Sequence, residues 1–367
     1  MRLLLSLLLS LFLSACTHSP SEKIMVYAWM GGPGDATDQE IGAQFANLKQ
    51  KGVDALLYNG GHNPEVYQRV GEIAKAQGLK FHAWIPTLLQ GKNDQLKAEY
   101  YVVNSNGESA LEKPAYVGYY TFLCPSHEGV FHYLENIYLN VAKVPSIDGV
   151  HLDYIRFPDV ILARGLWEKY GLTMDREYPE FDYCYCSKCT DDFAEQSGIN
   201  INEVEDPSQV EEWKQFRRNL ITNLVNRLAQ SVLESGKEIT AAVFPGPHSV
   251  ASQIVRQEWD LWNLDAVFPM NYNDFYLEDA AWVGDVTREG VESLGGKFPL
   301  YSGLFICPDP ENRHKQADPE NHGLTPDELR VAIKASMDNG AAGICLFTPG
   351  RMTDAHWTAL RETIYAN

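Results

Sequence analysis

Residues 148–158 read Asp148-Gly-Val-His-Leu-Asp-Tyr-Ile-Arg-Phe-Pro158, an apolar run that ends in charged side chains. Side chains such as Val150 and Leu152 suit a buried β-strand. Asp153 and Arg156 would be costly in an apolar core unless they were paired or faced a cavity. The pattern therefore predicts a central strand that ends in a functional site. A purely structural Asp–Arg pair at a strand end is the alternative.

Strand-like and helix-like segments alternate on both sides of this stretch. The predicted strands are residues 25–30, 55–59, 80–88, 148–158, 238–244, 266–270, 300–306 and 342–347. The predicted helices are residues 38–51, 64–77, 128–141, 211–235, 278–293, 325–339 and 354–366. Because parallel neighbours require crossover connections, this pattern predicts an α/β fold, a (β/α)8 TIM barrel with a long insertion after strand four.

An open, doubly wound sheet is the alternative fold. A dinucleotide-binding sheet of that kind carries a GxGxxG turn after its first strand. The corresponding turn here, Gly31-Gly-Pro-Gly34, lacks that spacing, and its proline removes a backbone donor. The sequence therefore favours the barrel.

The chain begins with Met1-Arg2 and an apolar run over residues 3–13, which is typical of an export signal and too short to span a bilayer. The small residues before Cys16 resemble the lipobox of bacterial lipoproteins and imply lipidation of Cys16. An ordinary secreted protein is the alternative. We expect a signal peptide at 1–15, a polar tether at 16–23 and one domain at 24–367. Thr17, in place of an aspartate, favours the outer membrane of a bacterial envelope.

The charge balance restricts the partners. The sequence has 30 Lys+Arg and 49 Asp+Glu, a formal net charge of −19. Such an acidic surface argues against nucleic acid and against a polybasic membrane contact, so membrane contact is expected through the N-terminal lipid only. No cofactor is predicted.

Three of the remaining six cysteines form a cluster, Cys184-Tyr-Cys-Ser-Lys-Cys189. The cluster is compatible with a loop disulfide plus a spare thiol, or with three thiolates of a zinc site. Structural zinc takes four ligands, and no fourth ligand is evident nearby in the sequence. We therefore assign no metal from the sequence.

The active site of a (β/α)8 barrel lies at the C-terminal ends of its strands. The aromatic and polar residues at these ends suit a neutral, polyhydroxylated ligand better than a nucleotide or a fatty acid. The predicted substrate-binding residues are Trp29, Tyr58, Asn59, His82, Trp84, His151, Arg156, Asn271 and Tyr272.

Asp153 and Asp274 are the predicted catalytic pair, because glycoside cleavage requires two carboxyl groups. The nearby Arg156 would keep Asp153 ionised, as a nucleophile or a stabiliser of the transition state requires. Asp274 would then be the acid/base, although Asn-Asp after a strand is also ordinary turn chemistry. Asp159 is the substitute acid. The sequence has no GxSxG elbow and no HExxH motif.

Residues 148–158, together with residues 123–128 (Leu-Cys-Pro-Ser-His-Glu), resemble the bacterial lipoproteins grouped as glycosyl-hydrolase-like family 10, which carry a DGIHLDYIRYP-type strand. The resemblance extends to residues 104–107, to the cysteine cluster and to residues 269–272. It implies a barrel hydrolase of a bacterial surface polysaccharide.

A weaker likeness exists to chitinase-type barrels, whose fourth strand reads DGxDxDxE. Here His151 replaces an aspartate of that motif, Ile155 replaces its catalytic glutamate, and Asn273 replaces the last aspartate of the MxYD motif on strand six.

The expected function is a lipid-anchored glycoside hydrolase that cleaves a cell-envelope or extracellular polysaccharide, with amino-sugar polymers among the candidates. A non-catalytic carbohydrate-binding lipoprotein is the alternative, which Ile155 in the place of the acid favours. A zinc-dependent deacetylase is a third hypothesis, which metal analysis would test.

Overall fold

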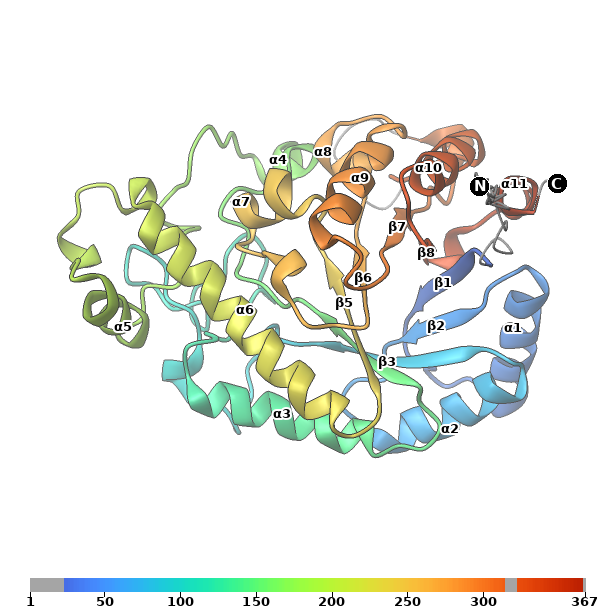
Figure 1. Cartoon of the computed structure of the whole chain (residues 1–367), viewed down its shortest axis with the longest axis horizontal. Coiled ribbons are helices and arrows are strands. Elements are labelled where there is room, and N and C mark those ends of the chain that lie inside the picture. Colours follow the sequence, from blue (N-terminus) through green and yellow to red (C-terminus); the bar gives the residue numbers. More distant parts are fainter. Residues whose placement is uncertain (1–22, 314–321, 366–367) are drawn as a thin grey trace, which may run out of the picture.

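The computed structural model describes residues 23–313 and 322–365, which form a ring of parallel strands surrounded by helices (Figure 1). The strands are β1 (Met25–Met30), β2 (Ala55–Tyr58), β3 (Lys80–Pro86), β4 (Gly149–Asp153), β5 (Glu238–Val243), β6 (Ala266–Pro269), β7 (Tyr301–Phe305) and β8 (Gly343–Phe347). The predicted (β/α)8 barrel is confirmed, and each predicted strand overlaps an observed one.

The barrel has one thin seam. Seven strand pairs form continuous parallel ladders in the order β6-β5-β4-β3-β2-β1-β8-β7. The ring closes between β6 and β7 through two isolated parallel bridges, Val267 with Leu300 and Met270 with Gly303. The eight strands therefore enclose an interior that side chains fill.

Long amphipathic helices cover the outside of the barrel. They are α1 (Asp38–Gln50), α2 (Pro64–Ala76), α3 (Glu128–Ala142), α6 (Glu211–Leu233), α9 (Trp282–Leu294), α10 (Pro326–Asp338) and α11 (Asp354–Ile364). In α1 the buried side chains Ile41, Phe45 and Leu48 repeat at helical spacing, and Thr37 with Glu40 forms a capping box at its start. Local sequence and tertiary packing thus agree on where this helix begins and which face it buries.

Alternation along the strands divides the core into two layers. On β1, Val26 and Ala28 belong to the large cluster that includes residues of the surrounding helices, whereas Tyr27 and Trp29 belong to a smaller cluster inside the barrel. Inside, the ring of Phe268 lies 4.9 Å from that of Tyr27, between centroids. Aromatic rings therefore fill much of the barrel interior below the site.

Two long connections lie at the C-terminal ends of the strands. Residues 87–127 follow β3, and residues 154–210 form the predicted insertion after β4, which carries the short helices α4 (Trp167–Tyr170) and α5 (Ser187–Ser197). Figure 1 shows α5 at the far end of the molecule from β1 and α1. The insertion is confirmed, and both connections contribute to the cavity described below.

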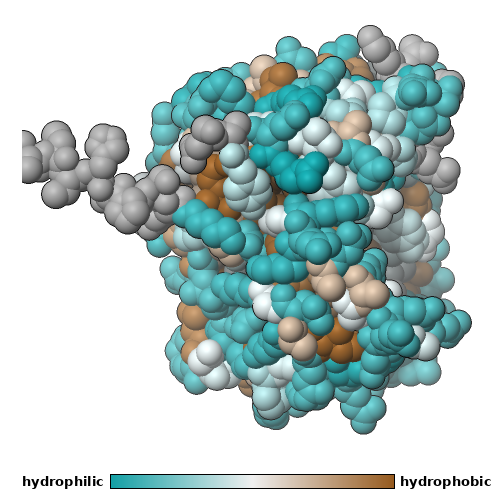
Figure 2. Space-filling view, turned by 90° about the vertical axis from the view of Figure 1, so that its right-hand side faces the viewer, coloured by the Kyte–Doolittle hydropathy of each residue, from teal (hydrophilic) through white to brown (hydrophobic). Residues whose placement is uncertain are grey.

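The predicted signal peptide and Cys16 lie outside the described residues. Among the helices of residues 23–313 and 322–365, none is both long and apolar enough to cross a lipid bilayer. Figure 2 shows that the face on the side of α1 and α11 is covered mainly by hydrophilic side chains, with small separate apolar patches. Isolated apolar side chains of this kind are normal on a protein surface.

Candidate active site

A cavity of about 370 Å³ opens at the C-terminal ends of the strands, the position at which barrel enzymes bind their ligands. This volume lies within the range of small-molecule sites. Its walls are predominantly aromatic. The lining residues are Trp29, Trp84, Tyr119, Tyr120, Asp153, Tyr154, Arg156, Asp159, Leu162, Ala163, Leu166, Lys169, Tyr170, Ala242, Phe244, Met270, Tyr272, Phe275, Tyr276 and Phe347.

Asp153 is the last residue of β4, and its side chain is held in a fixed position. Its Oδ2 accepts a hydrogen bond from Trp84 Nε1 at 2.8 Å, and its Oδ1 accepts one from the backbone N–H of Tyr154 at 2.7 Å. Tyr154 has a backbone φ of 48°, in the left-handed region that residues with a side chain seldom adopt. Unusual backbone conformations of this kind concentrate at functional sites, where the surroundings hold them in place.

Burial raises the pKa of Asp153 above its usual value, although the Tyr154 N–H, the Trp84 indole and the charge of Arg156 oppose the rise. The residue is only 6% exposed. A carboxyl group with a raised pKa holds its proton to a higher pH, which is the property of a general acid. The sequence-based expectation that Arg156 is the main influence on the pKa of Asp153 is wrong, because burial has the larger effect.

Arg156 instead forms a buried ion pair with Asp159, with 2.8 Å between Nη1 and Oδ2. Its guanidinium carbon lies 4.9 Å from the ring centroid of Phe244 and 5.6 Å from that of Tyr120. Burial by itself lowers the pKa of Arg156, but the carboxylate of Asp159 raises it, so the side chain stays charged. Asp159, the predicted substitute acid, therefore lies in the cavity wall and is paired there.

Two of the predicted ligand-binding residues, His82 and His151, belong to a polar column inside the barrel. Trp29 Nε1 donates to His151 Nε2 at 3.0 Å, and His151 Nδ1 lies 2.8 Å from Thr240 Oγ1. Burial keeps the pKa of His151 well below its usual value, so the ring is neutral and its Nδ1–H donates to Thr240. Below it, His82 Nε2 lies 3.4 Å from Glu238. Neither histidine lines the cavity.

Three more predicted ligand-binding residues have other neighbours. Tyr58 is buried in the outer core against Phe81, and the Oδ1 of Asn59 accepts the Gly61 N–H at 3.2 Å within a turn. The Nδ2 of Asn271 donates to two buried hydroxyl groups. The structure brings together five of the predicted binding and catalytic residues at the cavity. They are Trp29, Trp84, Asp153, Arg156 and Tyr272.

Asp274, the other predicted catalytic carboxyl, lies in the short helix α8 (Asn273–Tyr276) and does not line the cavity. Its Oδ1 accepts from Arg313 Nη2 at 2.6 Å, and its Oδ2 accepts from the backbone N–H of Gly323 at 2.7 Å. Both oxygen atoms therefore have strong partners in the loop between β7 and α10.

Most of the cavity wall comes from residues that the sequence did not predict. Tyr119 and Tyr120 come from the connection after β3, and Lys169 and Tyr170 come from the insertion after β4. The pair Tyr119-Tyr120 in an irregular segment was a usable signal, because adjacent aromatic residues in a polar loop need a reason to be there. Tyr119 is 59% exposed, so its ring is available to a ligand.

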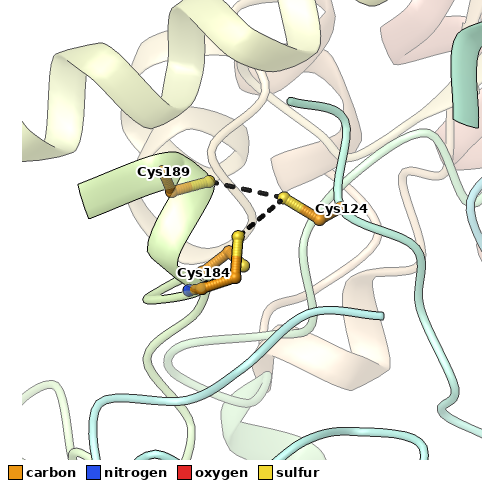
Figure 3. A group of neighbouring side chains, drawn as sticks. Cys124, Cys184 and Cys189 are labelled. Carbon is orange, nitrogen blue, oxygen red and sulfur yellow. Dashed lines mark hydrogen bonds between the residues drawn. The ribbon is translucent and has the colours of Figure 1, made fainter. Parts of the chain in front are cut away.

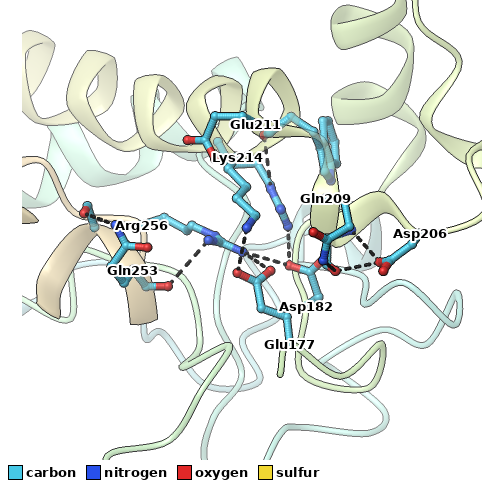
Figure 4. Close-up of polar contacts among 12 residues, drawn as sticks. Glu177, Asp182, Asp206, Gln209, Glu211, Lys214, Gln253 and Arg256 are labelled. Atoms are coloured by element: carbon cyan, nitrogen blue, oxygen red, sulfur yellow. Dashed lines mark hydrogen bonds and ion pairs between the residues drawn. The ribbon is translucent and has the colours of Figure 1, made fainter. Parts of the chain in front are cut away.

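A buried ion network attaches the insertion to α6 (Figure 4). The Nη1 of Arg217, on α6, is paired with Asp182, and it also donates to the carbonyl of Tyr183 at 2.8 Å. Arg256 lies 2.5 Å from Glu177 and 3.5 Å from Asp182, between charged atoms. Since Glu177 and Asp182 belong to the insertion, the network fixes one wall segment of the site to the barrel.

Comparisons with known proteins support the architecture. No family model matches the sequence, and neither does any curated protein. Solved structures do match. The glycoside hydrolase domain of PgaB (BpsB) from Bordetella bronchiseptica is 15% identical with a TM-score of 0.66, over 94% of this chain and 99% of that one.

The catalytic domain of the β-amylase from Paenibacillus polymyxa is 10% identical, with a TM-score of 0.60 over 95% of this chain and 99% of that one. A class V chitinase from Pseudomonas fluorescens Pf-5 is 11% identical, with a TM-score of 0.50 over 93% and 99%. At such low identities a likeness shows the fold and no more. The resemblance to the family 10 lipoproteins stays a prediction. This chain has the barrel architecture of these glycoside hydrolases.

Proposed function

We propose that this protein is a glycoside hydrolase that acts on a bacterial cell-envelope or extracellular polysaccharide, anchored to the envelope by lipid on Cys16. The observation that carries the proposal is Asp153, a buried carboxyl group with a raised pKa at the end of β4, in the wall of an aromatic cavity. Aromatic faces pack well against the C–H faces of sugar rings, and a protonated carboxyl group can donate to a glycosidic oxygen.

In the proposed reaction Asp153 donates its proton to the leaving oxygen as the glycosidic bond breaks. Asp159 is the other carboxyl group among the described residues that line the cavity, and it is the candidate for activating water. Its Oδ2 lies 2.8 Å from Nη1 of Arg156, which holds the carboxyl group in the cavity wall. This arrangement assigns Asp153 the acid role and removes Asp274 from the reaction.

A screen of purified envelope polysaccharides for release of reducing ends tests the proposal. The full chain should release new reducing ends from at least one glycan, with amino-sugar polymers among the first to try. If the protein binds one or more glycans but cleaves none in the whole panel, the enzymatic proposal is contradicted.

That outcome would favour the second candidate, a non-catalytic carbohydrate-binding protein. One observation supports this candidate. The carboxylate of Asp159 is already engaged by Arg156, so the cavity offers only one carboxyl group outside an ion pair among its described lining residues. In a hydrolase, Arg156 would position Asp159 as the catalytic base. In a binding protein, Arg156 would only neutralise Asp159. The two cases share the fold, and turnover distinguishes them.

Replacing Tyr119 with Ala is expected to weaken glycan binding about five-fold with little change in kcat. The exposed ring offers a stacking face at the edge of the cavity, and a lost aromatic contact of about 1 kcal/mol corresponds to this factor. Isothermal titration with the glycan found in the screen measures it. Tyr365→Ala, which removes a tyrosine that is 49% exposed just after α11, is the control and should leave affinity unchanged.

Replacing Asp274 with Asn is expected to keep turnover within about three-fold of wild type but to lower stability by about 1–3 kcal/mol. The substitution removes the charge that pairs with Arg313 and weakens the bond from the Gly323 N–H. Steady-state kinetics and thermal unfolding distinguish the two effects. If Asp274→Asn abolishes turnover in a stably folded protein, Asp274 is the acid/base after all.

A further inference from the structure

Four cysteine side chains converge at one point outside the cavity. Cys124 lies just before α3, and Cys184, Cys186 and Cys189 belong to the insertion after β4. All four are buried free thiols, and their Sγ atoms all lie within 4.8 Å of one another. Figure 3 shows the sulfur atoms of Cys124 and Cys189 directed toward each other, with Cys184 beside them. The fourth ligand that the sequence did not reveal is thus 60 residues away along the chain from the cluster's first cysteine, at Cys124.

The spacing of the sulfur atoms suits a tetrahedral metal ion. Four sulfur atoms at about 2.3 Å from a central zinc are about 3.8 Å from one another. The Sγ of Cys124 lies 3.8 Å from that of Cys186 and 3.4 Å from that of Cys189. Two disulfides would require close approach only within each pair, whereas here all four sulfur atoms surround a common centre.

The surroundings supply hydrogen-bond donors to sulfur. The backbone N–H groups of Val103 and Cys186 each donate to Cys184 Sγ at 3.4 Å. The hydroxyl of Ser126 can donate to Cys124 Sγ, at 3.1 Å, whereas its oxygen accepts from the Cys189 thiol at 3.4 Å. Such donors stabilise thiolates and orient them, as the outer shell of a metal site does.

Helix α5 adds a favourable field. Cys186 is its N-cap and Cys189 lies in its first turn, where the helix dipole favours negative charge. His127 Nε2, at 3.8 Å from Cys186 Sγ, is a further polar neighbour.

We propose that Cys124, Cys184, Cys186 and Cys189 bind one structural zinc ion. Each thiol loses its proton to solvent as its sulfur bonds to Zn²⁺, so no oxidant or reductant is required. Four sulfur ligands close the tetrahedron and leave no position for a substrate, and none of the four cysteines lines the cavity. At a given set of ligands, Zn²⁺ also binds more tightly than Fe²⁺. This site therefore supplies no Lewis acid for a deacetylase reaction in the cavity.

The zinc would join the two long connections that form the cavity wall. Cys124 follows Tyr119 and Tyr120 closely in the connection after β3, and the other three ligands follow Lys169 and Tyr170 in the insertion. Tying these segments together restricts the unfolded chain and holds the wall in place, because metal binding is coupled to folding.

Metal analysis of the purified full chain tests the proposal. We expect about one zinc ion per chain by inductively coupled plasma mass spectrometry. The four thiols should resist alkylation in the native protein and react once a chelator has removed the metal. Chelation should also lower the melting temperature by roughly 5 °C or more.

Cys186→Ser should lose most of the zinc, whereas Cys307→Ser, which removes a buried cysteine outside the cluster, should retain it. The zinc content, alkylation and chelation measurements on the wild-type chain test the proposal even if one of these variants fails to fold. Iron in place of zinc, two disulfides among the four cysteines, or four free thiols that take up no metal after equilibration with zinc salts would each overturn the proposal.

Discussion

Asp153→Asn is expected to lower kcat by about 10³-fold while the barrel stays folded, which places it among the largest effects available in this chain. Asparagine has the same shape and keeps an oxygen that can accept from Trp84 Nε1 or from the Tyr154 N–H. It cannot donate a proton to a leaving oxygen. Release of reducing ends measures the loss, and circular dichroism with thermal unfolding checks the fold.

Asp148→Asn is the matched control, because Asp148 lies directly before the opposite end of the same strand. Its Oδ2 accepts the Phe81 N–H at 2.8 Å, and its other oxygen lies 3.6 Å from Lys75. This variant should keep wild-type turnover. Because the acid form of Asp153 is the active one, wild-type kcat should also fall as pH rises through its raised pKa. Equal turnover in Asp153→Asn and wild type would disprove the assignment.

Asp182→Asn is expected to destabilise the protein by about 3–5 kcal/mol, because it leaves the fully buried Arg217 without its anion. The Oδ2 of Asp182 also accepts the hydroxyl of Tyr185 at 2.5 Å, and Arg256 would lose part of its compensation. Urea unfolding measures the difference. Asp338→Asn, which removes one partner of an exposed pair with Lys334, should change stability by less than about 0.5 kcal/mol.

The same substitution has a defined pH dependence. Burial raises the pKa of Asp182, but the charges of Arg217 and Arg256 outweigh it, so the net pKa in the folded chain is lowered. A carboxyl group of this kind stabilises the folded state fully above its unfolded pKa of about 3.9, and the contribution is lost as pH falls through the folded value. The stability difference between Asp182→Asn and wild type should therefore shrink below about pH 4. If the stability difference between Asp182→Asn and wild type stayed constant at acidic pH, lost packing and not lost charge would explain the destabilisation.

The barrel was predictable because its signals are local and repeated. Short apolar runs and helices with an apolar face alternate along the chain, and several helix starts carry recognisable chemistry, such as the capping box of Thr37 and Glu40. Two boundaries differ by several residues. They are the end of β4, predicted at Pro158 and observed at Asp153, and the start of α9. The sequence suggests a helix from residue 278, whereas α9 begins at Trp282 because residues 277–281 form a turn.

The cavity was only partly predictable, because its wall comes from irregular connections. Periodicity identifies which residues of a strand face the interior, and it correctly groups Trp84 with Asp153. It also could have excluded Tyr58, whose neighbour Leu57 faces the interior instead. Periodicity does not show, however, how far below the cavity an inward-facing residue lies along the barrel axis. His151 faces inward one layer below Asp153, and only the packed barrel shows that a tryptophan covers it.

Long-range pairs were not predictable from spacing. Arg156 is as close in sequence to Asp153 as to Asp159, and the turn after β4 decides which carboxylate it meets. The same limit applies to Cys124, which reaches the other three cysteines only because the connection after β3 packs against the insertion after β4. The residue types indicate which chemistry each side chain can perform, but the tertiary structure determines which partner it meets.

The thin seam of the barrel has a mechanical consequence. A ring of strands opens most easily where it has the fewest hydrogen bonds, and here that place is between β6 and β7. Met270 and Tyr272, which directly follow β6, line the cavity beside this seam. The opposite wall is fixed by ladders, by ion pairs and by the cysteine cluster. Transient opening of the barrel would therefore widen the cavity on the side of β6 and β7, while the opposite wall stays in place.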